Sequence, residues 1–350
     1  MATITDADRK RMGTMHPDMS AALERSPFPD LTAGDPNASV QTVRHNRAEH
    51  LKKLRPLYSI PGPIPADVKE SDHQVQTRDG QSIRVRVYVP TKPADGPRPL
   101  IVMYHEGGWR MGDLTDEDLN CRMFARDLGA VCVNVEYRLA PEHPFPTGVD
   151  DAYDTLLWCT KTASATSEIL PADLEAGFIV GGSSAGGNFA AVMSQRARDE
   201  RLNPPLTGQY LSVPGLLSKP AIPEKWKGVC RSRAESEYDP VLKMKDREKD
   251  SGKVEHLNVE PDNPLYSPLL HENLGNLPPA FFQIAGLDPL RDEGLLYEEE
   301  LKKKGVSTRM NVYDGFGHMF WTNWPTLHQS QDFVSDTLAG VKWLLEAKAK

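Results

Sequence analysis

The sequence predicts an α/β fold in which helices flank a mostly parallel central sheet. Short apolar runs alternate along the chain with polar, helix-like stretches, and one of these runs leads directly into a serine with glycines on both sides. Strands of a parallel sheet are buried on both faces, so they appear as continuous apolar runs. Helices connect such strands, and the repeated order of strand, helix and strand is typical of this class.

The predicted strands begin with residues 83–89, where Ile and Val alternate with Arg and Tyr. This period of two indicates a half-buried strand. The continuous apolar runs that follow predict strands at 100–104, 131–135, 178–180, 211–213, 281–284 and 309–313. Helices are predicted at 115–128, 150–163 and 289–304, and the last of them has proline at its start and glycine after its end.

Two segments do not follow this rhythm. Residues 1–60 are polar with scattered apolar positions, and Val43, Leu51, Leu54 and Tyr58 predict one side of a short helix. The segment 218–262 is highly charged, and we expect an insertion over one end of the sheet that packs against the amino-terminal arm. Disorder is the alternative for its most charged part, 243–253.

Composition limits the function. The chain has 350 residues, 39% of them hydrophobic, which suits one large domain. A net charge of −8 disfavours nucleic acid and anionic membranes as partners. There is no apolar stretch of transmembrane length and no visible signal segment, and the four cysteines are widely spaced. We therefore expect buried, reduced thiols and a cytoplasmic location.

Ser184 lies between a predicted strand and a predicted helix. The segment 178–191 reads FIVGGSSAGGNFAA, which places Gly182 and Gly186 two residues on either side of the serine. A serine at such a sharp turn needs small neighbours because its backbone is strained, and the turn exposes its Oγ. The sequence therefore predicts a nucleophile elbow.

A serine hydroxyl is a weak nucleophile at neutral pH, so it needs a base and a group that orients the base. His318 follows the last predicted strand among glycines and is the candidate base; a surface-loop histidine is the alternative. Asp288 follows the strand at 281–284 and is the candidate acid, although an aspartate there also suits a helix cap. Asp292 competes for this role but lies inside the predicted helix.

The order of these residues supports the assignment. Serine, acid and histidine follow one another along the chain as they do in α/β-hydrolases, and each comes just after a strand. Ligands and catalytic groups of open α/β sheets gather at those strand ends.

A glycine pair supplies the remaining part of such a site. Residues 105–109 read HEGGW and follow the strand at 100–104. The backbone N–H groups of Gly107, Gly108 and Ala185 would bind the oxyanion of a tetrahedral intermediate. A plain Gly-Gly turn is the alternative reading when Ser184 is left out of account. We expect His105 to brace this loop. The sequence HEGG also lacks the second histidine of a zinc-binding H-E-x-x-H motif.

From residue 98 to 345 the chain resembles the hormone-sensitive-lipase-like, or bacterial type IV, carboxylesterases of the α/β-hydrolase superfamily. The resemblance rests on the serine, glycine and histidine motifs above, together with YRLAPEHPFP at 137–146 and DPLRDEG at 288–294. It implies the α/β-hydrolase fold, with residues 61–350 as catalytic domain. It also implies a cap from 1–60 and a cap or lid insertion after the sixth strand at 218–262.

The resemblance assigns the same roles to the site residues. It implies Ser184 as nucleophile, His318 as base and Asp288 as acid, with the glycine pair and Ala185 as oxyanion donors. The block at 137–146 is expected to be scaffold, held by a salt bridge of Arg138.

The chain departs from the family at two positions. Glu106 stands where the H-G-G-G motif has glycine, and Ser183 stands where G-D-S-A-G-G has aspartate. Neither change removes a catalytic atom. A carboxylate beside the oxyanion hole would oppose the developing negative charge. We therefore expect Glu106 to be turned away from the oxyanion and hydrogen-bonded.

The predicted function is a serine carboxylic-ester hydrolase that acts on short to medium acyl esters without a metal or organic cofactor. Trp109, Leu216, Phe316 and Phe320 are the candidate pocket walls, although the core suits the three aromatic residues equally well. The alternatives are a dedicated natural-product deacetylase, a lactone hydrolase and an acyltransferase. A non-catalytic small-molecule receptor is less favoured, because such binders are expected to lose a triad member. The expected partner is a small-molecule ester, and a homodimer is a family-level expectation.

Overall fold

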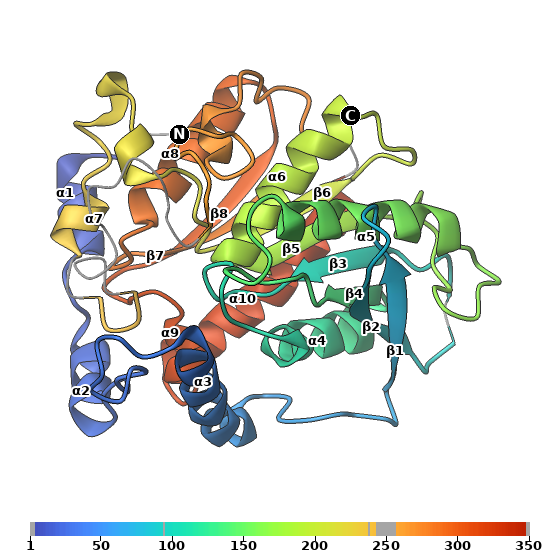
Figure 1. Cartoon of the computed structure of the whole chain (residues 1–350), viewed down its shortest axis with the longest axis horizontal. Coiled ribbons are helices and arrows are strands. Elements are labelled where there is room, and N and C mark those ends of the chain that lie inside the picture. Colours follow the sequence, from blue (N-terminus) through green and yellow to red (C-terminus); the bar gives the residue numbers. More distant parts are fainter. Residues whose placement is uncertain (1–3, 94, 237–238, 243–256, 348–350) are drawn as a thin grey trace.

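An eight-stranded sheet forms the centre of the computed structural model, which describes residues 4–93, 95–236, 239–242 and 257–347 (Figure 1). The strand order is β1-β2-β4-β3-β5-β6-β7-β8. β1, β2 and β4 pair antiparallel, and all other neighbours pair parallel. The predicted α/β fold with a mostly parallel sheet is therefore confirmed. The strands are β1 (Val68–Gln76), β2 (Ser82–Pro90), β3 (Leu100–Tyr104), β4 (Val131–Val135), β5 (Phe178–Ser183), β6 (Gly208–Ser212), β7 (Ala280–Ala285) and β8 (Thr308–Tyr313).

Helices cover both faces of this sheet. In β3, Val102 and Tyr104 pack into one cluster with α5, α6 and α8, whereas Ile101 and Met103 pack into another with α4 and α10. Alternate side chains of a strand point to opposite faces, so a fully apolar strand serves two cores. The helices that cover the sheet are α4 (Asp118–Leu128), α5 (Thr147–Thr162), α6 (Ala185–Asp199), α8 (Arg291–Lys303) and α10 (His328–Glu346).

The remaining helices lie in the amino-terminal arm and in the loops. The arm contains α1 (Asp6–Met12), α2 (Pro17–Arg25), α3 (Val40–Leu54) and η1 (Arg55–Leu57). The loops contain η2 (Leu114–Asp116), η3 (Lys219–Ala221), η4 (Glu224–Trp226), α7 (Ser232–Glu235), η6 (Pro268–Leu270) and α9 (Phe320–Asn323).

The structure adds one strand that the sequence analysis did not identify. β1 reads VKESDHQVQ, and only its two Val residues are buried. An edge strand exposes one side to solvent, so its polar sequence carries little strand signal. Its register with β2 is complete over nine residue pairs, from Val68 opposite Pro90 to Gln76 opposite Ser82.

The amino-terminal arm packs against the described part of the segment 218–262. Arg9 Nη1 lies 2.5 Å from Asp292 Oδ1 of α8 and donates to the carbonyl oxygen of Val229 at 3.3 Å. Arg231 Nη2 donates to Asp6 Oδ1 at 2.9 Å. The expected contact between arm and insertion is therefore confirmed, whereas residues 243–253 lie outside the described part of the chain.

The cysteines are free thiols, as their wide spacing in the sequence predicts. Cys121, Cys132 and Cys159 are buried free thiols, and Cys230 is half-buried. Burial raises the pKa of the Cys159 thiol, which keeps it protonated at neutral pH. Among the residues that the structure describes, no helix has the length and apolar character to span a membrane.

The packing of α10 on the sheet generates a stability prediction. A Cβ at Gly340 would lie 2.0 Å from Cε1 of the Phe281 ring in β7. Alanine gains about 1 kcal/mol over glycine in a helix, but overpacking a core costs about 1–3 kcal/mol. We expect Gly340→Ala to lower the free energy of unfolding, measured by urea denaturation. Gly62→Ala is the control, because its Cβ would meet nothing within 4 Å. A Gly340→Ala protein as stable as this control would contradict the prediction.

Candidate active site

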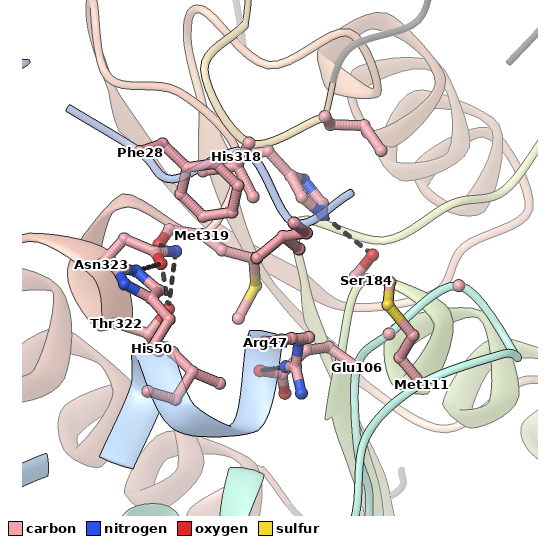
Figure 2. A pocket seen from close by; sticks show the side chains of 16 residues that line it. Phe28, Arg47, His50, Glu106, Met111, Ser184, His318, Met319, Thr322 and Asn323 are labelled. Atoms are coloured by element: carbon pink, nitrogen blue, oxygen red, sulfur yellow. Dashed lines mark hydrogen bonds and ion pairs between the residues drawn. The ribbon is translucent and has the colours of Figure 1, made fainter. Parts of the chain in front are cut away.

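The structure brings Ser184, His318 and Asp288 together in one hydrogen-bonded chain. His318 Nδ1 lies 2.6 Å from Asp288 Oδ2, and His318 Nε2 lies 2.9 Å from Ser184 Oγ (Figure 2 draws the second bond). An ionised carboxylate only accepts hydrogen bonds, so Nδ1 donates and Nε2 is left to accept from the serine hydroxyl. The exposed fractions are 9% for Ser184, 3% for His318 and 1% for Asp288, so the chain is shielded from bulk water.

A strained turn between β5 and α6 fixes the position of Ser184. Its backbone has φ 54° and ψ −114°, a conformation that costs a residue other than glycine about 1–3 kcal/mol. The Ser184 N–H donates to the carbonyl oxygen of Ser212 in β6 at 2.8 Å. A Cβ at Gly182 or Gly186 would lie 2.3 or 1.9 Å from the carbonyl oxygen of Tyr104. Only glycine fits at both positions, as the motif predicts.

The contacts of Asp288 and Asp292 agree with the choice of Asp288 as the orienting group. Asp288 also accepts from the N–H of Leu290 at 2.8 Å, just before α8 begins, so it holds both the loop and His318. Asp292 instead pairs with Arg9 and Arg291 and accepts the N–H groups of Arg231 and Ser232. Both oxygens of Asp292 therefore form ion pairs or hydrogen bonds in the contact between the arm, the segment 218–262 and α8.

The glycine loop presents backbone donors next to the serine. Gly107 has φ 123° and Gly108 has φ 61°, and a Cβ at Gly107 would lie 2.3 Å from the carbonyl oxygen of Met111. No hydrogen bond among the described residues uses the N–H of either glycine. Ala185 is the first residue of α6, where an N–H has no partner within the helix. These three groups are available to an oxyanion.

His105 braces this loop, as expected. Its Nδ1 lies 2.8 Å from the carbonyl oxygen of Glu106, and its ring stacks on Tyr137 with centroids 4.1 Å apart. Arg138, next in the chain, donates to both oxygens of Asp151. The predicted scaffold role of this block is confirmed in these contacts.

Glu106 is paired, as expected, although it also lines the pocket. Arg47 of α3 donates to Glu106 Oε1 at 2.8 Å and to Asp116 Oδ2 at 2.9 Å. Burial raises the pKa of Glu106 well above its usual value, Asp116 adds to this effect, and Arg47 opposes it. The guanidinium between the two carboxylates offsets the negative charge that Glu106 would otherwise place beside the oxyanion donors.

A second carboxylate, which no local sequence pattern indicates, contacts the backbone of His318. Asp239 Oδ2 accepts the backbone N–H of His318 at 2.7 Å, and its Oδ1 accepts from Val241 and Leu242. Burial and the neighbouring Asp288 raise the pKa of Asp239 to about 6, while His318 acts in the opposite direction. Asp239 lies 79 residues before His318, and no local pattern links them. Gly317 has to be small here, since its Cβ would lie 2.5 Å from Asp239 Oδ2.

A pocket with about 630 Å³ of space, partly open to solvent, leads to Ser184. The amino-terminal arm, the glycine loop, the described residues 241–242 and the segment after His318 all contribute to its wall (Figure 2). The wall residues beyond the catalytic pair and the glycine loop are Phe28, Leu31, Arg47, His50, Leu51, Met111, Val241, Leu242, Met319, Thr322 and Asn323. Three of them, Arg47, His50 and Leu51, are at helical spacing on α3, a signal that the sequence carried.

The predicted pocket walls need correction. Leu216, Phe316 and Phe320 are buried in the core at 0%, 2% and 0% exposure, and none of them lines the pocket that contains Ser184. Trp109 lines a separate, smaller pocket with Tyr266. The rings of Phe316 and Phe320, on either side of His318 in the chain, contact each other with centroids 4.8 Å apart and a tilt of 39°. Position next to a motif predicted these residues, but side-chain direction decides which of them face the substrate.

Comparisons with known proteins identify the fold and the family. A family model described as the α/β-hydrolase fold matches residues 101–322. An AB hydrolase superfamily protein of Schizosaccharomyces pombe is 36% identical, with 99% of this chain and 98% of that protein covered. A carboxylesterase of Mycobacterium tuberculosis, NlhH, is 36% identical over 74% of this chain and 77% of its own length.

Two solved structures are similar over almost the whole chain. Vibralactone cyclase superposes with a TM-score of 0.86 at 32% identity, covering 97% of each chain. An esterase of Pyrobaculum calidifontis superposes with a TM-score of 0.76 at 33% identity, covering 96% of this chain and 100% of that one.

The contact of Asp239 with the triad histidine generates a prediction. In Asp239→Asn the oxygen stays with Val241 and Leu242, so the amide N–H would face the N–H of His318. A buried donor without an acceptor costs about 1–3 kcal/mol. We expect kcat to fall by about tenfold, measured with a chromogenic ester. The exposed Asp262→Asn is the control, and equal kcat values for both variants would contradict the role of Asp239.

The raised pKa of Asp239 also gives this variant a pH signature. A carboxyl whose pKa is higher in the folded state contributes stability that is complete below its unfolded value of 3.8 and is lost as the pH rises through about 6. The Asp239→Asn protein has no carboxyl at this position, so its stability does not fall for this reason as the pH rises. In urea denaturation, the free energy of unfolding of the variant is therefore expected to rise relative to that of the wild type between pH 4 and pH 7.

The Glu106–Arg47 pair generates a further prediction. In Glu106→Gly, Arg47 keeps Asp116 and the backbone donors remain, so we expect kcat to change by less than about tenfold, or roughly 1.4 kcal/mol. The melting temperature should fall, since a buried ion pair loses one partner. Glu142→Gly is the matched control, because Glu142 pairs with Arg44 on the same helix at a more exposed position. A rise in kcat beyond tenfold would mean that Glu106 opposes the oxyanion.

Proposed function

Since this chain belongs to the hormone-sensitive-lipase-like family of α/β-hydrolases, we propose that it cleaves short to medium acyl esters through an acyl-enzyme on Ser184. The class of reaction follows from its relatives: the protein is a carboxylic ester hydrolase that acts on small-molecule esters. The catalytic roles, the acyl length and the cap are our proposals. A cytoplasmic location and a homodimer stay predictions from the sequence.

In the proposed mechanism, His318 Nε2 takes the Ser184 proton as Oγ attacks the ester carbonyl carbon. Asp288 holds the imidazole in the required tautomer and stabilises the imidazolium that forms. The N–H groups of Gly107, Gly108 and Ala185 bind the oxyanion. His318 then protonates the leaving alcohol. Water repeats the cycle on the acyl-enzyme, which releases the acid and restores Ser184.

One observation carries the proposal, namely the buried chain of hydrogen bonds from Ser184 Oγ through His318 to Asp288, with Ser184 and His318 lining a pocket. The two distances, 2.9 and 2.6 Å, are hydrogen-bond distances, and each donor meets an acceptor. A non-catalytic receptor would have no need for this chain. The complete triad therefore favours the enzyme over the receptor.

We propose that residues 1–60 act as the cap of this site. Phe28, Leu31, Arg47, His50 and Leu51 come from this arm and line the pocket. Val241 and Leu242, which belong to the described part of the segment 218–262, also line the pocket and support the same role. The amino-terminal arm and the segment 218–262 contact each other through Arg9 and Arg231. This contact favours a single cap formed by both parts of the chain.

Acyl transfer to a hydroxyl is the second candidate, because the structural likeness to vibralactone cyclase covers 97% of each chain. In that case a hydroxyl oxygen in place of water would attack the acyl-enzyme, and its proton would pass to His318. The products would be a new ester or lactone and free Ser184. A dedicated deacetylase or lactone hydrolase would use the same acyl-enzyme with water.

The first test is hydrolysis of p-nitrophenyl esters from acetate to palmitate by the wild type, Ser184→Ala, His318→Ala and the double variant. We expect a maximum at short or medium chains. Each single variant should lose several orders of magnitude in kcat, and the double variant little more, because the two residues act as one unit.

The outcomes separate the candidates. Losses that add in the double variant would contradict the shared mechanism, and a maximum at palmitate would contradict the acyl length. Analysis of the products with a competing alcohol distinguishes hydrolysis from acyl transfer, since only transfer yields a new ester.

A further inference from the structure

The pocket wall has a polar group that the proposed chemistry does not use. His50 of α3, Thr322 and Asn323 of α9 all line the pocket, and they lie together in Figure 2, on the other side of the view from Ser184. Their neighbours on the wall include apolar residues of the arm and of the described residues 241–242. A plain alkyl chain would fill this space without using the polar atoms.

The hydrogen bonds of Asn323 fix the direction of this group. Asn323 Nδ2 donates to the carbonyl oxygen of Met319 at 2.9 Å and to Thr322 Oγ1 at 3.3 Å. Its amide nitrogen therefore faces inward to two acceptors, and its Oδ1 faces His50 Nε2 at 3.1 Å. An amide oxygen only accepts, so Nε2 of His50 carries the proton.

A neutral imidazole with its proton on Nε2 has a bare acceptor at Nδ1. Within the described residues, the His50 ring makes no hydrogen bond other than the one to Asn323. Burial lowers the pKa of His50, although the bond to Asn323 opposes this, so the neutral form is favoured at neutral pH. The ring of Phe28 packs edge-on against His50 at 5.4 Å and limits its rotation.

We propose that His50 accepts a hydrogen bond from a hydroxyl group of the substrate, and that the natural ester carries this hydroxyl several bonds away from the reacting carbonyl. The inference rests on the proposed function, because it concerns the substrate of the same site. Next to this polar group the wall includes apolar residues of the arm and residues 241–242. A substrate hydroxyl would pair with the acceptor at Nδ1, whereas an apolar group placed there would leave it unpaired. The substrate class is then a hydroxylated short or medium ester.

The experiment compares three forms of one ester at the acyl length that the wild type cleaves fastest: plain, with a terminal hydroxyl, and with a terminal methoxy group. The methoxy ester has the oxygen without the donor. The same three forms are made on the alcohol side of an acetate. In one of the two series the wild type should show a kcat/KM about threefold to tenfold higher for the hydroxyl form than for the methoxy form.

Substitutions of His50 test whether this residue causes the preference for the hydroxyl form. His50→Leu should bring the ratio of kcat/KM for the hydroxyl form to that for the methoxy form close to one, whatever its effect on the plain ester. His50→Gln should keep part of this ratio because its amide oxygen accepts a hydrogen bond. His50→Phe replaces the leucine variant if that protein does not fold. His45→Leu is the matched control, because His45 lies on the same helix and is exposed.

Binding to Ser184→Ala separates this inference from the proposed function. Calorimetry with the uncleaved esters should give the same order, with the hydroxyl form bound more tightly than the methoxy form, and His50→Leu in that background should remove the difference. This order would support the inference even if no ester were turned over. Equal affinities and equal kcat/KM values in both series, or a preference that His50→Leu leaves unchanged, would overturn it.

Discussion

The strained turn at Ser184 is the constraint on which the rest of the site depends. The nucleophile keeps φ 54° only because β5 and α6 cross so closely over the end of β3 that the Tyr104 carbonyl leaves no room for a Cβ at Gly182 or Gly186. Such strain persists when the surrounding structure holds it in place. Here β3, β5 and β6 are parallel neighbours in the buried sheet. The same close approach places the glycine loop after β3 next to the serine.

Buried charges connect the amino-terminal arm to this rigid base. Arg47 of α3 lies between Glu106 and Asp116, and Arg9 of α1 pairs with Asp292 of α8. A buried charge without a partner is expensive, so each of these contacts specifies where the arm sits. The arm in turn supplies much of the pocket wall. The pocket wall therefore comes from several parts of the chain, which meet near Ser184.

The family and the pocket wall bear on two different aspects of function, namely the type of reaction and the substrate. In the proposed mechanism, the triad and the glycine loop supply the general chemistry of ester hydrolysis or acyl transfer. The polar group of His50, Thr322 and Asn323 belongs to the wall, as does the paired Glu106. The family assignment therefore indicates the type of reaction, whereas the substrate that we propose depends on the residues of the pocket wall.

The sequence by itself determined the α/β fold, seven of the eight strands, the elbow, the glycine loop and the order of the three proposed catalytic residues, because each depends on local periodicity or a short motif. It favoured Asp288 over Asp292 only by its place before the helix. Its pocket walls lie in the core or, for Trp109, in a separate pocket. Tertiary structure decided these points, and it alone brought Asp239 to His318 and His50 to Asn323, which are 79 and 273 residues apart. The physical reason is that side-chain direction and long-range packing leave no periodic trace in a single chain.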